Sequence, residues 1–258
     1  MRWLASEVAR FAGQLTAERL AVQAQLFLIP VPTLAEEVDA MVQILDASEQ
    51  RRAAEYRHLQ SRSNFVTARA FLRLAMAEVL GRAAGRLEFA TGESGKPFLV
   101  SENNRSLEFN LSHSGNHCLV ALVCGAPIGV DLEQWREQID RKGIAARFFT
   151  AEECAWISEG DPAEQVGRFY DCWTLKEAFL KATGAGIVSG LNSFSIRAAC
   201  SAPIHEDLKM VLAPGGEWIL GRVPITLASC SAAVCWGRNG PEAFQLNCLH
   251  AAPLSSHG

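Results

Sequence analysis

Asp131 and Glu133 stand two residues apart in the apolar segment that begins at Ile128. In a β-strand, residues i and i+2 project from the same face, so this spacing predicts two neighbouring carboxylates. Paired carboxylates repel each other unless a cation lies between them, and a hard divalent ion such as Mg²⁺ prefers oxygen ligands of this kind. Two surface acids on a solvated edge strand are the alternative for this segment taken alone.

Glu177 and Lys181 are four residues apart and share one helix face with Trp173. The helix is predicted over residues 162–183, because an Asp N-cap and a proline open it and glycines close it. On an exposed face the two residues would form an ordinary ion pair that contributes about 0.3–0.5 kcal/mol. In the functional interpretation, Glu177 completes the metal site or acts as a base, and Lys181 contacts a phosphate.

The segment Asn110–Ser114 is a third polar group, predicted at the end of a strand. The hydroxyl of Ser112, the ring of His113 and local backbone N–H groups are able to bind phosphate oxygens, although a lone histidine is often structural. The absence of a Gly-x-Ser-x-Gly sequence argues against a Ser–His hydrolase. Upstream, the turn Ser94–Pro97 offers Lys96 either as another phosphate ligand or as a solvated lysine.

The composition is that of a soluble protein with a full core, since 49% of the 258 residues are hydrophobic and 20% are charged. A formal net charge of −4 argues against a nucleic-acid-binding protein. Neither a signal peptide nor a membrane-spanning segment is recognisable, so we expect a cytoplasmic protein. The 8 cysteines include no Cys-x-x-Cys pair, which favours reduced thiols over a zinc site.

The order of predicted elements indicates an α+β protein built from two similar halves. We expect a helical N-terminal extension over residues 1–24 and a first α+β half over residues 25–120. A second α+β half over residues 121–249 carries the metal site, and a polar tail covers residues 250–258.

Five motifs follow one another along the chain. They are Gly-Lys-Pro at 95–97, Asn-x-Ser-His-Ser at 110–114, Gly-Val-Asp-Leu-Glu at 129–133, Arg-Phe-Phe at 147–149 and Trp-Thr-Leu-Lys-Glu-Ala-x₃-Lys-x₂-Gly-x-Gly at 173–186. In this order they resemble the 4′-phosphopantetheinyl transferases of the two-domain, surfactin-synthetase-activating (Sfp) type. The resemblance implies a pseudo-two-fold pair of α+β halves with the active site, and coenzyme A, in the cleft between them.

The resemblance also implies residue roles at the matching positions. Asp131, Glu133 and Glu177 would hold the Mg²⁺ ion that bridges the pyrophosphate of coenzyme A. Glu177 and Lys181 would be catalytic, with Glu177 taking a proton from the acceptor serine and Lys181 contacting the phosphates. The coenzyme A-binding set comprises Lys96, Pro97, Ser112, His113, Lys181, Arg62 and Arg69.

Within that set, Lys96 and Pro97 would line the nucleotide pocket and His113 would reach the 3′-phosphate. The family also has basic residues before and within the first long helix, where this chain has six arginines between residues 51 and 73. We favour Arg62 and Arg69 for the 3′-phosphate, and a solvated basic face is the alternative.

The implied reaction transfers the 4′-phosphopantetheine group from coenzyme A to a serine of an apo acyl or peptidyl carrier protein, releasing adenosine 3′,5′-bisphosphate. Two halves in one chain would let a monomer build the whole site. A Mg²⁺-dependent phosphohydrolase or nuclease is one alternative, but the sequence has no second cluster of acids for a second metal. A non-catalytic binding protein is another, and it would be expected to lack Asp131, Glu177 or Lys181.

Overall fold

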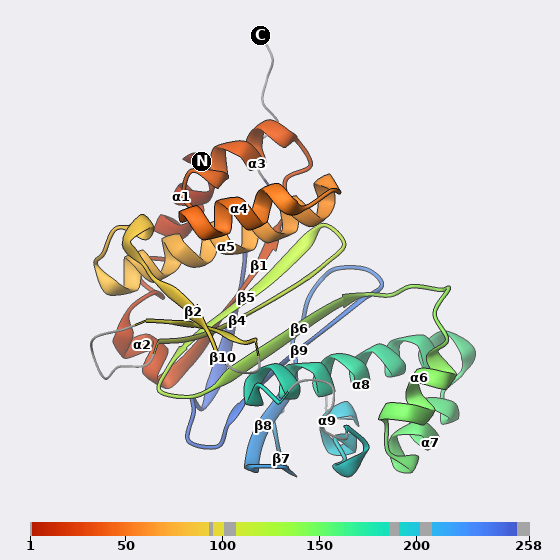
Figure 1. The fold of residues 1–258 in the computed structure, drawn as a ribbon. Coiled ribbons are helices and arrows are strands. Elements are labelled where there is room, and N and C mark those ends of the chain that lie inside the picture. Colours follow the sequence, from red (N-terminus) through yellow and green to blue (C-terminus); the bar gives the residue numbers. More distant parts are fainter. Residues whose placement is uncertain (1, 93–94, 101–106, 186–190, 202–207, 252–258) are drawn as a thin grey trace.

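The computed structural model describes residues 2–92, 95–100, 107–185, 191–201 and 208–251. Figure 1 shows two sheets at the centre, with one group of helices on one side and a second group on the other. The α+β class predicted from the sequence is confirmed. In the described residues, no helix has both the length and the apolar character needed to cross a membrane.

The first half contains one four-stranded sheet and the long helix α5 (Leu59–Leu80). Its other elements are α1 (Arg2–Arg10), α2 (Ala17–Val22), β1 (Gln23–Pro30), α3 (Ala35–Val42), α4 (Ala47–Glu55), η1 (Ala84–Arg86), β2 (Phe89–Thr91), β3 (Pro97–Leu99), β4 (Leu107–Ser114) and β5 (His117–Cys124). The strand β4 ends at Ser114, so the Asn-x-Ser-His-Ser motif forms the end of a strand, as predicted.

The second half repeats this plan around the long helix α8 (Pro162–Thr183), which has the bounds predicted from its capping signals. Its other elements are β6 (Ile128–Gln134), α6 (Arg141–Phe148), α7 (Ala151–Glu159), η2 (Leu191–Ser193), α9 (Arg197–Ser201), β7 (Lys209–Ala213), β8 (Gly216–Arg222), β9 (Cys230–Gly237) and β10 (Ala243–Cys248).

The strand orders β10-β1-β5-β4 and β6-β9-β8-β7 express the pseudo-two-fold relation. In each half, the first strand pairs antiparallel with the second strand of a hairpin: β1 with β5, and β6 with β9. The last strand, β10, leaves the second half and pairs in parallel with β1. The position 120 that was expected to end the first half lies within β5, and the turn to β6 follows that strand. The strand β10 belongs to the first sheet.

The predicted N-terminal extension is helical, and it is part of the first half's core. Leu4, Val8 and Leu20 are buried there against α5 and the outer face of β1. The backbone N–H of His250, just after β10, donates to Glu7 of α1. The helices of the predicted extension thus pack into the first half, whereas residues 252–258 of the predicted tail lie outside the described residues.

The inner faces of the two sheets pack against each other. Leu26 of β1 and Leu119 of β5 lie in one buried cluster with Val130 of β6 and Trp236 of β9. The opposite faces pack on the long helices, giving the order helix, sheet, sheet, helix. Because residues in a strand alternate between faces, the residues at 129, 131 and 133 of β6 face α8.

Candidate functional site

Asp131 and Lys181 meet where β6 faces α8, next to β4 of the first half. Asp131 is 3% exposed, and Lys181 Nζ donates to its Oδ1 at 2.6 Å. Lys181 Nζ also donates to Ser112 Oγ at 3.0 Å, and that hydroxyl donates to Asp131 Oδ1 at 2.9 Å. The two halves therefore share this site, as the resemblance implied.

Gly129 allows this close approach of β6 and α8. A Cβ at position 129 would collide with the helix backbone at Ala178 and Ala182. A side chain there would move the helix that carries Glu177 and Lys181 away from the strand that carries Asp131.

Glu177 lies in the same environment as Asp131. Burial and the neighbouring Asp131 raise the pKa of Glu177 to about 7, against the opposing effect of Lys181. Burial and Asp131 also raise the pKa of Glu133, whose Oε2 accepts from Ser114 Oγ at 3.1 Å. Three carboxylates thus act on one another, opposed by Lys181 and, at Glu133, also by Arg136. This is the electrostatic setting of a cation site.

Two carboxylate oxygens in this site are well suited to a metal ion. Asp131 Oδ2 and Glu177 Oε1 are buried and have no hydrogen-bond partner in the part of the chain that the structure describes. Buried charged oxygens without partners are strongly unfavourable, and hard cations such as Mg²⁺ take oxygens of this type. Among the described residues, no three His, Cys, Asp or Glu side chains are already close enough together to hold a metal ion. The donor chemistry fits a divalent ion.

A cavity of about 330 Å³ lies on the other side of β4. Its wall includes Arg69, Pro97 and His113, which the sequence assigned to coenzyme A binding, together with Arg52 and Tyr56, which it did not. Partial burial and the Lys181 ammonium lower the pKa of His113. Because His113 and Ser112 are adjacent in a strand, they project from opposite faces of β4, one towards the cavity and one towards the carboxylates.

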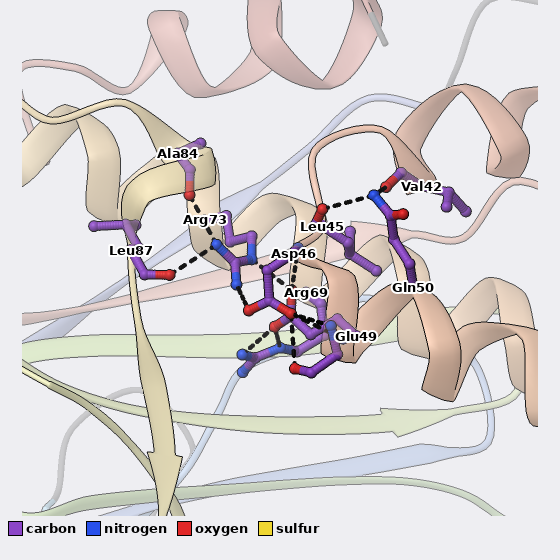
Figure 2. Close-up of polar contacts among 10 residues, drawn as sticks. Val42, Leu45, Asp46, Glu49, Gln50, Arg69, Arg73, Ala84 and Leu87 are labelled. Carbon is purple, nitrogen blue, oxygen red and sulfur yellow. Dashed lines mark hydrogen bonds and ion pairs between the residues drawn. The ribbon is translucent and has the colours of Figure 1, made fainter.

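Arg69 and Arg73 leave α5 on one face and share the carboxylate of Glu49 (Figure 2). Arg73 is fully buried and also pairs with Asp46 and donates to the carbonyls of Ala84 and Leu87. Arg69 is the member of the pair that lines the cavity, and its guanidinium lies 4.3 Å from the ring centroid of Phe89.

Two predicted ligands have other partners in the structure. Arg62 forms an ion pair with Asp39 at 2.7 Å and is not part of the cavity wall. Lys96 Nζ donates to the backbone carbonyls of Ile128 and Ala182 at 3.1 and 3.0 Å, so it connects the β2–β3 hairpin to the second half. Both contacts depend on tertiary structure that the local sequence does not contain.

Lys176, the lysine next to Glu177 in the long motif, has a structural role. Its ammonium pairs with Glu153 at 3.0 Å, and both side chains are 0% exposed. It also donates to the carbonyls of Leu191 and Phe194. Because α8 turns by about 100° per residue, Lys176 and Glu177 face different surroundings.

The sequence of the chain is similar to those of known proteins. The sequence model of the 4′-phosphopantetheinyl transferase superfamily matches residues 127–213, and that of the 4′-phosphopantetheinyl transferase N-terminal region matches residues 32–124. A Synechocystis relative is 39% identical over 149 residues, which are 58% of this chain and 61% of the relative. The Bacillus subtilis 4′-phosphopantetheinyl transferase is 32% identical over 167 residues, 64% of this chain and 72% of that protein.

The two-sheet α+β fold, the acidic site between its halves and the similarity to 4′-phosphopantetheinyl transferases therefore agree. The chain belongs to the 4′-phosphopantetheinyl transferase family. Within the family it is of the Sfp type, since Sfp of Bacillus subtilis is 28% identical over 176 residues, 68% of this chain and 74% of Sfp.

Proposed function

We propose that Asp131, Glu133 and Glu177 hold a Mg²⁺ ion at the catalytic site of this transferase. The observation that carries the proposal is the pair of buried carboxylate oxygens, Asp131 Oδ2 and Glu177 Oε1, without hydrogen-bond partners among the described residues. A bound Mg²⁺ ion supplies positive charge that neutralises phosphate oxygens and orients them for displacement. Asp131 and Glu177 lie where β6 faces α8, next to β4 of the first half.

The enzyme transfers the 4′-phosphopantetheine group from coenzyme A to a serine of a carrier protein. The serine oxygen forms a bond to the β-phosphorus, and the bond to the leaving adenosine 3′,5′-bisphosphate breaks. Glu177, a carboxylate of the same site, accepts the serine proton as a general base. Lys181, whose ammonium is anchored by Asp131 and Ser112, offsets charge on the leaving phosphate.

The cavity beside β4 takes the nucleotide end of coenzyme A. Arg69 and His113 are the groups in its wall that suit the 3′-phosphate, and Pro97 and Tyr56 offer apolar surface to the base. The acceptor is an apo acyl or peptidyl carrier protein. A single chain supplies residues from both halves, so a monomer suffices.

Intact-mass spectrometry of an apo carrier protein incubated with the enzyme, coenzyme A and Mg²⁺ tests this function. We expect a gain of about 340 Da on the carrier serine, abolished by a chelator and by Glu177→Gln. Phosphate release without a carrier would instead indicate a hydrolase. An unmodified mass across several acyl and peptidyl carriers would contradict the transfer.

A further inference from the structure

The two sheets pack by their inner faces, and at one side of this packing their edge strands lie next to each other. These are β4, the edge strand of the first sheet, and β6, the edge strand of the second. An edge strand presents backbone N–H groups that no neighbouring strand pairs, and buried N–H groups need acceptors. Val130 and Leu132 of β6 are buried, so their N–H groups have little access to water.

Side chains of β4 provide the acceptors. The N–H of Val130 donates to Asn110 Oδ1 at 2.9 Å, that of Leu132 to Ser112 Oγ at 3.2 Å, and that of Gln134 to Ser114 Oγ at 2.9 Å. Alternate residues of one strand thus bond to alternate residues of the other. We refer to these three contacts as the β4–β6 seam.

Two of the three seam side chains have a second contact, and in both cases it is a carboxylate of the site. Ser112 Oγ donates to Asp131 Oδ1 at 2.9 Å, and Ser114 Oγ donates to Glu133 Oε2 at 3.1 Å. A hydroxyl has one proton to donate. When it accepts from the N–H of residue i+1, its proton is directed at the side chain of residue i.

The first contact of the seam lacks this second function. The residue before Val130 is Gly129, which has no side chain. Asn110 therefore closes the same kind of backbone contact without holding a carboxylate, which makes it a natural control.

The geometry points to Ser112 and Ser114 as positioning residues that fix Asp131 and Glu133 for metal binding, an inference that rests on the proposed metal site. Ser112 and Lys181 both bond Asp131 Oδ1, and this leaves Oδ2 without a partner in the described structure. The seam holds the two halves together through the same hydroxyl groups that orient the carboxylates. The relative position of the halves thereby sets the position of the ligands.

Mn²⁺ binding, followed by the electron paramagnetic resonance signal of the free ion with coenzyme A present, tests this role without relying on turnover. We expect Ser114→Ala to weaken Mn²⁺ binding about 10-fold, as loss of a hydrogen bond to a metal ligand commonly does. Ser114→Thr, which keeps the hydroxyl, should restore the affinity. Asn110→Ala should lower the melting temperature at least as much as Ser114→Ala and leave Mn²⁺ affinity within about 2-fold of wild type.

A double-mutant comparison separates positioning from general loosening of the fold. If Ser114 acts through Glu133, Ser114→Ala should weaken binding by less than about 2-fold further in a Glu133→Gln background. Two results would overturn the positioning role and leave the metal site standing. One is an equal loss of Mn²⁺ affinity in Ser114→Ala and Asn110→Ala, and the other is full additivity of Ser114→Ala with Glu133→Gln. If the Glu177→Gln variant binds Mn²⁺ as tightly as the wild-type protein does, the metal site itself is wrong, and this inference falls with it.

Discussion

The two halves anchor their long helices in the same way. The short helices α4 and α7 each have 9 residues and begin with a capping box, whose glutamate is Glu49 in one half and Glu153 in the other. Each glutamate forms an ion pair with a basic side chain on the 22-residue helix that follows. Arg73 lies 14 residues after Leu59, and Lys176 lies 14 residues after Pro162.

The anchors differ in what surrounds them. Lys176 and Glu153 are sealed from solvent. In the first half Glu49 is shared with a second arginine, Arg69, which lies where the second half has Cys172 and which reaches the cavity. The ion-pair network of the first half thus borders a cavity, whereas the Lys176–Glu153 pair of the second half is wholly internal.

The long helices differ again on the next face. Glu177 and Lys181 of α8 occupy the positions of Leu74 and Glu78 of α5. Leu74 packs against the first core, and Glu78 is exposed. A repeated scaffold therefore carries the proposed catalytic pair on one helix and a cavity-lining arginine on the other, because a few positions outside the shared anchor differ.

The largest effect should come from the chemistry of the second half. Glu177→Gln removes the proposed base and metal ligand with little change in shape, and we expect transfer to fall by at least about 1000-fold. Glu78→Gln, an acid on the first half's helix, is the matched control and should leave the rate unchanged. Intact-mass kinetics on an apo carrier measure both, and near-normal turnover by Glu177→Gln would remove the difference between the helices.

The next effect concerns the anchors themselves. Glu153→Gln leaves the Lys176 ammonium buried without its counter-charge, and we expect a loss of about 3 kcal/mol in the free energy of unfolding. Glu49→Gln should lose less, because Arg73 keeps Asp46 and two carbonyls and Arg69 borders the cavity. Urea denaturation compares them. A larger loss for Glu49→Gln would contradict the expectation that the remaining partners of Arg73 and Arg69 compensate for the lost charge.

The sequence predicted those parts of the site that depend on local periodicity. A period of two aligns Asp131 with Glu133, and a period of 3.6 aligns Glu177 with Lys181, so both pairs and the bounds of α8 follow from spacing and capping. The family and the α+β class were likewise predicted correctly from the order of the motifs.

The remaining features depend on contacts between distant segments. Among the arginines near α5, only tertiary packing decides that Arg69 faces the cavity while Arg62 pairs with Asp39. The same holds for Lys96, whose ammonium is satisfied by carbonyls of the other half, and for β10, which returns to the first sheet. Ser114 was visible within a motif, but its bond to Glu133 requires the seam between the sheets.

A smaller effect tests the cavity of the first half. Arg69→Ala should raise the KM for coenzyme A about 10-fold, since a charged hydrogen bond to a phosphate is lost. The same variant should behave like wild type with 3′-dephospho-coenzyme A, which lacks that phosphate. Arg62→Ala is the control and should change neither value. An equal loss with both substrates would assign Arg69 to the fold instead of the 3′-phosphate.

The smallest effect follows from charge balance. In the first half two carboxylates face two arginines. In the second, the three carboxylates of Asp131, Glu133 and Glu177 face Lys181 and, at Glu133, also Arg136. The pKa of Glu177 is raised from 4.5 to about 7, so the folded state binds more protons than the unfolded state between these values. Stability of the metal-free protein should therefore fall as pH rises through this range.

Other groups titrate in the same range, so a difference between variants is needed. The raised pKa of Glu133 acts in the same direction as Glu177, and the lowered pKa values of His113 and His117 act in the opposite one. In a chelator, Glu177→Gln should match wild type near pH 5 and melt about 3 °C higher at pH 8. Added Mg²⁺ should stabilise wild type at pH 8 more than the variant. If wild type and Glu177→Gln differ by the same melting temperature at pH 5 and pH 8, the second half has no unbalanced charge at Glu177. The contrast between the halves would then rest on packing alone.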